Sequence, residues 1–81
     1  MTISETYDEI CGFLQPYNKK NIRLTPETEL AADLEMDSAD AMNLIMEIEE
    51  GFQIDIPLNL LGDVQNLRQL LALVQARIES R

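Results

Sequence analysis

Apolar residues recur every three or four positions in three stretches of the chain, which predicts three amphipathic helices. The first stretch runs from about Ile3 to Leu14, the second starts at Ser38, and the third runs from about Val64 to Glu79. No stretch alternates apolar and polar residues for long, so no strand is predicted. The expected core positions are Ile3, Tyr7, Ile10, Cys11 and Leu14 in the first helix, Ala41, Leu44, Ile45, Ile48 and Phe52 in the second, and Val64, Leu67, Leu70, Leu71, Val74 and Ile78 in the third.

Local signals indicate where these helices begin and end. Thr2 with Glu5 three residues later matches a capping box, and Pro16 ends the first helix because the residue before a proline disfavours helical geometry. Gly51 is expected either to close the second helix or to stand exposed inside it. Asp63 is the expected N-cap of the last helix.

The connection between the first two helices, from about Tyr17 to Asp37, is long for a compact domain. Thr25-Pro26-Glu27 predicts a helical turn within it. After Pro57, residues 58–62 leave room for only a turn or so of helix. The residues expected to hold the long connection to the core are Ile22, Leu24, Leu30 and Leu34. The predicted fold is all-α, a small antiparallel helical bundle of three main helices plus one short helix, with a long first loop.

Size and charge narrow the possible partners. The 81 residues predict a single domain over 1–81. The net charge of −9 disfavours nucleic acid and anionic membranes and favours proteins with basic patches. No apolar run approaches the about 20 residues of a membrane span, and no secretory signal is evident. We therefore expect a cytoplasmic protein without membrane insertion.

The sequence offers little for catalysis or metal binding. It contains one cysteine, Cys11, and no histidine. A single cysteine forms no internal disulfide, which fits a reducing compartment, and a zinc site is not expected. Without histidine, Ser–His and Cys–His catalysis are excluded. We predict no catalytic and no metal-binding residues, and therefore a protein that is not an enzyme.

Ser38 stands within Asp37-Ser38-Ala39-Asp40, where a loop meets the second helix. Serine is a common helix N-cap, and Asp40 then lies near the positive end of the helix dipole, so capping is the simplest interpretation. A hydroxyl at this position is also accessible to the active site of another enzyme, and a helix N-terminus tolerates a phosphate.

Two segments around the second helix form a recognisable pattern: residues 30–38, Leu-Ala-Ala-Asp-Leu-Glu-Met-Asp-Ser, and residues 49–57, Glu-Glu-Gly-Phe-Gln-Ile-Asp-Ile-Pro. In these segments, and over most of the chain, the sequence resembles the acyl carrier protein family. The resemblance implies that a phosphopantetheinyl transferase attaches 4'-phosphopantetheine from coenzyme A to Ser38, flanked by Asp37. The thiol of that arm would carry acyl or aminoacyl groups as thioesters between enzymes of a lipid, polyketide or related biosynthetic pathway.

The resemblance also implies that acids of the second helix dock basic patches on acyl- or aminoacyl-loading and acyl-transferring enzymes. Ordinary solvated charges and core-edge methionines are the alternative interpretation of the same residues. The expected partner-binding residues are Asp40, Met42, Met46, Glu47, Glu49 and Glu50. Ala39 and the short, nearly uncharged segment after Pro57 depart from the family pattern and favour a specialised carrier. We expect the protein to be a monomer. The alternative function is an acidic helical interaction module without a prosthetic group.

Overall fold

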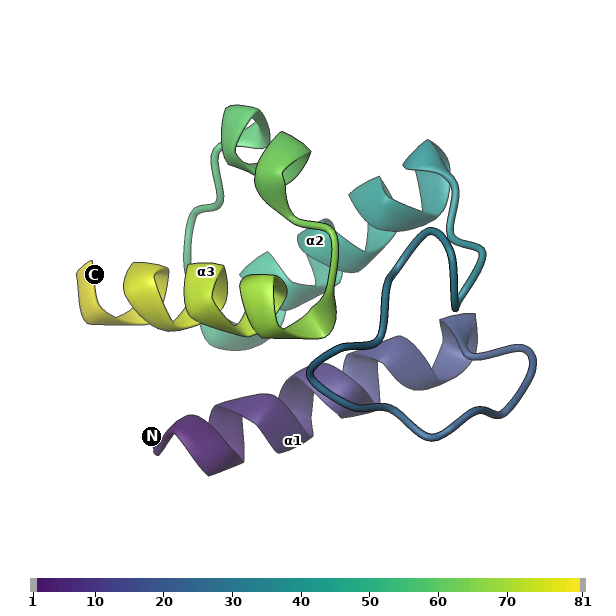
Figure 1. Ribbon diagram of the computed structural model, residues 1–81. Helices are drawn as coiled ribbons and strands as arrows, with labels where there is room; N and C mark the ends of the chain where they lie inside the picture. The colour runs from purple at the N-terminus through teal and green to yellow at the C-terminus, as the bar shows by residue number, and fades with distance from the viewer. Residues whose placement is uncertain (1, 81) are drawn as a thin grey trace.

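The computed structural model describes residues 2–80, and its helices follow the three predicted stretches (Figure 1). Within this range no strand forms, and a single antiparallel β-bridge joins Glu29 to Asn66. The predicted all-α bundle of three main helices and one short helix is confirmed, with a further 3-10 turn after the first helix. The elements in chain order are α1 (Ile3–Leu14), the 3-10 helix η1 (Gln15–Tyr17), α2 (Ser38–Phe52), the 3-10 helix η2 (Leu58–Asp63) and α3 (Leu67–Ser80).

The first helix packs against both of the others and runs in the opposite direction to them (Figure 1). The start of α1 and the end of α3 lie at one end of the molecule, whereas the start of α2 lies at the other end. The long connection between α1 and α2 bends around that second end. In the described part of the chain, no helix is long and apolar enough to cross a membrane.

Apolar residues from all three helices and both long connections form one core. The connections contribute Leu34, Met36, Ile54 and Ile56, each of which is buried. Burial of apolar side chains from loops as well as helices provides the main driving force for folding in so small a domain. The buried helical residues are Ile10, Leu14, Leu44, Ile45, Ile48, Phe52, Leu67, Leu70 and Val74.

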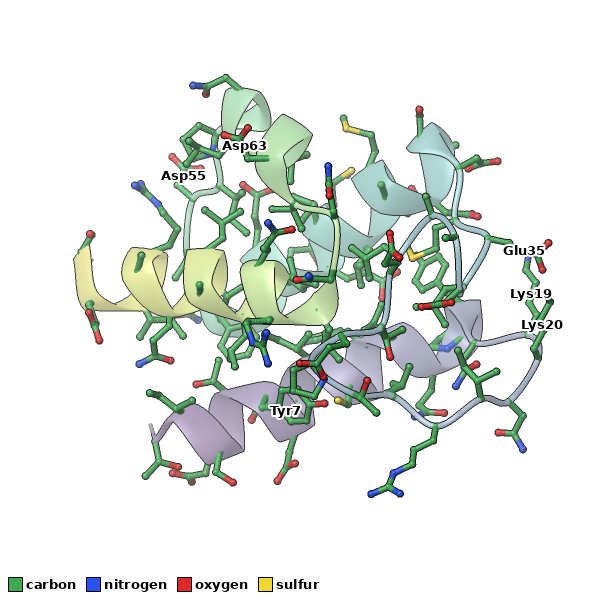
Figure 2. All side chains as sticks on the ribbon, in the orientation of Figure 1. Tyr7, Lys19, Lys20, Glu35, Asp55 and Asp63 are labelled. Atoms are coloured by element: carbon green, nitrogen blue, oxygen red, sulfur yellow. The ribbon has the colours of Figure 1, made fainter. Side chains whose placement is uncertain are left out.

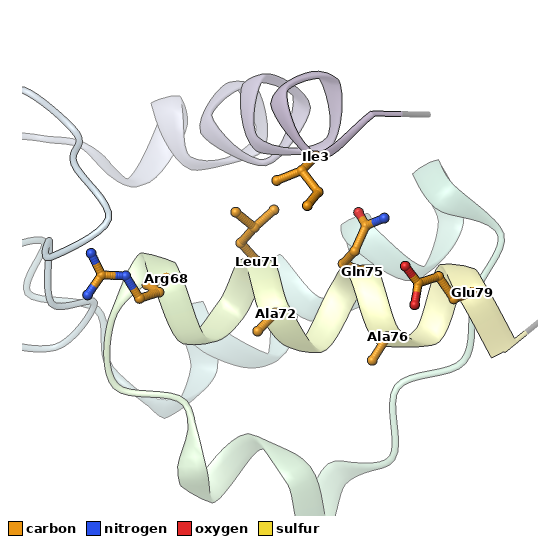
Figure 3. A pocket seen from close by; sticks show the side chains of 7 residues that line it. All are labelled: Ile3, Arg68, Leu71, Ala72, Gln75, Ala76 and Glu79. Atoms are coloured by element: carbon orange, nitrogen blue, oxygen red, sulfur yellow. The ribbon is translucent and has the colours of Figure 1, made fainter.

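Ile3 is not a core residue, contrary to the prediction. Its side chain is 61% exposed, at the edge of a groove between the start of α1 and α3 (Figure 3). The buried stripe of α1 instead runs through Thr6, Ile10 and Leu14, each four residues apart. Thr6 tolerates complete burial because its hydroxyl donates a 3.0 Å hydrogen bond to the Thr2 carbonyl.

The predicted capping box of α1 is confirmed. The Glu5 N–H donates to Thr2 Oγ1 at 3.1 Å, and the Thr2 N–H donates to Glu5 Oε1 at 3.0 Å. The two bonds satisfy donors that have no partner inside the helix. The hydrogen bond from the Thr2 backbone also lowers the pKa of the Glu5 carboxyl.

The last helix starts later than predicted, and its cap is Asn66 rather than Asp63. The Gln69 N–H donates to Asn66 Oδ1 at 2.9 Å, and Gln69 Oε1 accepts from the Asn66 N–H at 3.2 Å. Asp63 ends η2, and Val64 after it is extended. The helix therefore begins at Leu67, after the chain has turned out of η2.

Backbone pairing with the long connection explains this late start. Residues 26–30 pair with residues 65–68 through backbone hydrogen bonds, and the Glu29–Asn66 bridge keeps the chain out of the helix as far as Asn66. The predicted anchoring of the long connection is confirmed, since Leu34 is buried and Ile22, Leu24 and Leu30 pack against the core. The three hydrogen bonds, which we call the loop–α3 ladder, run from the Leu30 N–H to the Gln65 carbonyl (3.0 Å), from the Leu67 N–H to the Thr28 carbonyl (2.9 Å) and from the Arg68 N–H to the Pro26 carbonyl (2.9 Å).

Gly51 occupies an exposed position inside α2 and does not close it, so the second of the two alternatives is correct. Gln53 ends the helix in the left-handed conformation, with φ of 56°. Gly51 is instead the point where α1 approaches α2, because a Cβ there would lie 2.4 Å from the Phe13 ring. That ring also contacts Phe52, with ring centroids 6.1 Å apart.

Candidate functional site

Ser38 is the first residue of α2, and its side chain is exposed. The N-cap is Asp37, whose Oδ1 accepts a 2.8 Å hydrogen bond from the Asp40 N–H. The interpretation of Ser38 as the cap is therefore wrong, because Asp37 has the extended backbone that a cap requires. Within residues 2–80, no hydrogen bond engages Ser38 Oγ. Its hydroxyl is thus exposed and has no capping role.

The setting of Ser38 suits esterification by a phosphate. The first N–H groups of a helix lack intrahelical acceptors and form the positive end of the helix dipole. A phosphate bonded to Ser38 Oγ would lie beside these donors, which favour a negative charge. Asp37 and Asp40 flank the same hydroxyl and give its surroundings a negative charge. In residues 2–80, no group of three or more His, Cys, Asp or Glu residues is arranged to hold a metal ion.

The residues before Ser38 are held in place by the long connection. Leu34 and Met36 are buried, and the Met36 N–H donates to the Leu30 carbonyl at 3.1 Å. Glu35 between them points outward and pairs with Lys20 at 2.8 Å, beside Lys19 (Figure 2). The bond to Lys20 lowers the pKa of the Glu35 carboxyl. The path of the chain into α2 is therefore fixed by core packing more than by exposed charges.

Two open grooves reach Ser38. The loop-side groove has a volume of about 480 Å³, and the η2-side groove has about 310 Å³. An interior apolar cavity of only about 50 Å³ lies between α2 and the η2–α3 segment. The linings are, for the loop-side groove, Glu29, Leu30, Ala31, Ala32, Met36, Asp37, Ser38, Ala41, Val64 and Gln65, and for the η2-side groove, Ser38, Ala41, Met42, Leu61 and Gly62.

The lining of these grooves was not predicted from the sequence. Their residues come from four separate segments, so no local pattern marks them. A signal that could have indicated the loop-side groove is the pair Ala31-Ala32, two small residues that line it.

The predicted partner-binding residues of α2 are mostly on the surface. Met42 and Met46 are 41% and 55% exposed, unusually high values for large apolar side chains. Glu47 and Glu50 are exposed beside them, and Asp40 is partly exposed. Exposed methionine flanked by acids suits contacts with an adaptable, basic protein surface.

Two of these acids also have partners within the chain. Glu47 Oε1 accepts a 3.0 Å hydrogen bond from the Tyr17 hydroxyl of η1. Burial of the Tyr17 ring, together with this bond, raises the pKa of its hydroxyl. Glu49 is half-buried, and its Oε2 accepts a 2.9 Å bond from the Ile56 N–H. Glu49 therefore helps to fix the connection that follows α2.

Two other features, Cys11 and a groove beside α3, offer no reactive nucleophile. Cys11 is half-buried, and burial raises the pKa of its thiol, which keeps it protonated at neutral pH. The groove of Figure 3, of about 340 Å³, shares no lining residue with the grooves at Ser38. Its one unusual feature is Gln75 Oε1, which is buried without a hydrogen-bond partner in the part of the chain that the structure describes.

Comparison with known proteins agrees with this geometry. Residues 8–74 match the family described as "Phosphopantetheine attachment site". An acyl carrier protein of Phytoplasma mali is 35% identical over 63 residues, which cover 78% of this chain and 73% of that protein. An acyl carrier protein of Guillardia theta is 34% identical over 56 residues, 69% of each chain. A probable acyl carrier protein of Caulobacter vibrioides is 38% identical over 53 residues, 65% of this chain and 62% of that protein.

The matched segment contains the whole of α2 and the connections on both sides of it. Proteins of this kind are non-catalytic carriers that interact with a phosphopantetheinyl transferase and with biosynthetic enzymes. The predicted cofactor, covalently attached 4'-phosphopantetheine, is confirmed by the family match. The chain belongs to the acyl carrier protein family.

Proposed function

We propose that this chain is a discrete carrier, a single domain over residues 1–81, whose Ser38 is modified with 4'-phosphopantetheine. In the modification, the Ser38 hydroxyl gives its proton to the transferase and its oxygen bonds to phosphorus. The pyrophosphate bond of coenzyme A breaks, and the adenosine bisphosphate half leaves. The observation that carries the proposal is the exposed hydroxyl at the first position of α2, with Asp37 making the capping bond in its place.

The thiol of the arm then carries an acyl or aminoacyl group as a thioester between partner enzymes of a lipid, polyketide or related pathway. The chain has no histidine, so each transfer is expected to depend on the partner's active site. Its own residues orient the arm and present a recognisable surface. That surface is the exposed strip of α2 formed by Asp40, Met42, Met46, Glu47 and Glu50.

The modification is tested by mass. Incubation with coenzyme A and a broad-specificity phosphopantetheinyl transferase is expected to add about 340 Da, the mass of the phosphopantetheine group. Ser38→Ala abolishes the gain, whereas the matched control Ser4→Ala, at another exposed serine near the start of a helix, retains it. A wild-type protein that gains no mass contradicts the proposal and supports the acidic interaction module.

Docking through α2 is tested by reversing one of its charges. Glu50→Lys is expected to slow modification by the transferase roughly tenfold at low salt, because steering by opposite charges speeds encounter. Asp8→Lys makes the same charge change on exposed α1 and controls for net charge. Equal slowing by the two substitutions contradicts a specific role for α2.

A further inference from the structure

We propose that the 4'-phosphopantetheine arm on Ser38 lies in the loop-side groove, across Ala31 and Ala32 toward Gln65, rather than in the η2-side groove. This inference rests on the proposed modification of Ser38. It assigns a resting position to the arm between visits to partner enzymes, and it gives a role to residues outside α2.

The size of the available spaces favours the loop-side groove. Ser38 lines both open grooves, so either is within reach of its hydroxyl. The loop-side groove is the larger, at about 480 Å³ against about 310 Å³. The interior cavity, at about 50 Å³, does not admit a chain of this size unless the helices separate.

The chemistry of the lining favours the same groove. The arm beyond its phosphate alternates short apolar segments with two amides, so a matching site needs apolar walls and hydrogen-bonding groups. Ala31, Ala32, Met36 and Val64 supply apolar walls. The Gln65 side-chain amide both donates and accepts, and it has no hydrogen bond to other described residues. Among the described residues that line the η2-side groove, by contrast, only Ser38 has a polar side chain.

Charge determines which part of the arm enters. Glu29 also lines the loop-side groove and repels the phosphate, which stays bonded to Ser38 at the helix N-terminus. The pantetheine portion is neutral, so the carboxylate does not oppose it. Glu29 is a further acceptor for an amide N–H of the arm.

The groove is also preformed. The loop–α3 ladder bonds the Leu30 N–H to the Gln65 carbonyl at 3.0 Å, which joins the two walls directly. The Met36 N–H bonds the Leu30 carbonyl at 3.1 Å and fixes the floor. A rigid groove binds a tethered arm with a smaller loss of conformational entropy than one that must first close.

The proposal is tested by NMR on protein loaded from coenzyme A with a ¹³C-labelled pantetheine arm. We expect nuclear Overhauser contacts from the arm to the methyl groups of Ala31, Ala32 and Val64, and shifts of the Gln65 side-chain amide between the unmodified and the modified protein. Ala32→Leu fills the groove and abolishes these contacts. Gly62→Leu, the matched control in the η2-side groove, leaves them in place.

The possible results distinguish a failure of the proposed resting position from a failure of the proposed modification. Contacts to Met42 and Gly62 instead, or an arm without contacts to either groove, overturn this inference while leaving the modification intact. Gln65→Leu provides a second variant at an exposed position. It removes the side-chain amide that bonds the arm, so the chemical shifts of the arm's own amide groups are expected to change relative to those in the wild-type protein. Absence of any mass gain contradicts the proposed function itself.

Discussion

The two ends of α2 differ in how closely the rest of the molecule surrounds them. At the C-terminal end, Phe52 is 4% exposed, and the Phe13 ring lies where a Cβ on Gly51 would have to be. Glu49 is bonded to the Ile56 N–H just beyond. At the N-terminal end, Ser38 and Ala39 are exposed and two open grooves meet. One helix therefore has a closely packed end and an open end.

This division separates stability from function along a single helix. Packed side chains contribute most of the free energy of folding, whereas an open helix start contributes little more than its cap. An attachment site at the open end is therefore free to carry a large group without disturbing the core. The predictions below test the difference between the two ends, beginning with the largest effect.

Phe52→Ala removes the largest side chain of the packed end. We expect a loss of about 3–5 kcal/mol in the free energy of unfolding, which is a large part of the stability of a small domain. Urea denaturation followed by circular dichroism measures it. Met46→Ala, at a 55% exposed position of the same helix, is the control and should change stability by less than about 0.5 kcal/mol.

Gly51→Ala tests the close approach of α1. Helix propensity alone predicts a gain of about 1 kcal/mol, but the new methyl group would lie 2.4 Å from the Phe13 ring, so we expect a net loss of about 1–2 kcal/mol. Gly12→Ala is the matched control in α1, since its Cβ meets nothing within 4 Å, and it should gain about 0.5–1 kcal/mol. An equal gain in both variants contradicts the crowding at Gly51.

Asp37→Ala removes the cap at the open end. Loss of the bond from the Asp40 N–H is expected to cost about 1 kcal/mol in the free energy of unfolding. Asp37→Asn retains an accepting oxygen and should recover most of this loss. The same denaturation experiment measures both variants, and no recovery in Asp37→Asn contradicts the assignment of the cap.

Ser38→Ala should have the smallest effect. Because Asp37 makes the capping bond, the free energy of unfolding of the unmodified protein is expected to change by less than about 0.5 kcal/mol. A loss as large as that of Asp37→Ala shows instead that Ser38 contributes to the cap. An unchanged free energy of unfolding would also show that the loss of modification in Ser38→Ala does not result from misfolding.

Much of the fold was predictable because its signals are local. The apolar spacing located all three main helices, and Thr2, Glu5 and Pro16 set the limits of α1 correctly. Serine and aspartate are equally good caps, however, so local preference alone did not choose between Ser38 and Asp37. The choice depends on the extended backbone conformation of Asp37, the residue directly after the buried Met36.

The remaining differences arise from contacts between segments far apart in sequence. The loop–α3 ladder delays α3 until Leu67, and Asn66 rather than Asp63 then becomes its cap. The need for glycine at position 51 arises from Phe13, whose ring on another helix leaves no room for a Cβ. The position of Ser38 was predictable from the chain alone, but the grooves beside it were not, because they form only where several segments meet.

The placement of the two termini has a practical consequence. The start of α1 and the end of α3 share one end of the molecule, and α2 begins at the other (Figure 1). A fluorescent fusion or a bead-coupled tag joined beyond the start of α1 or the end of α3 would therefore lie at the opposite end of the molecule from Ser38, the first residue of α2. Immobilised protein prepared in this way presents its attachment point to enzymes in the surrounding solution.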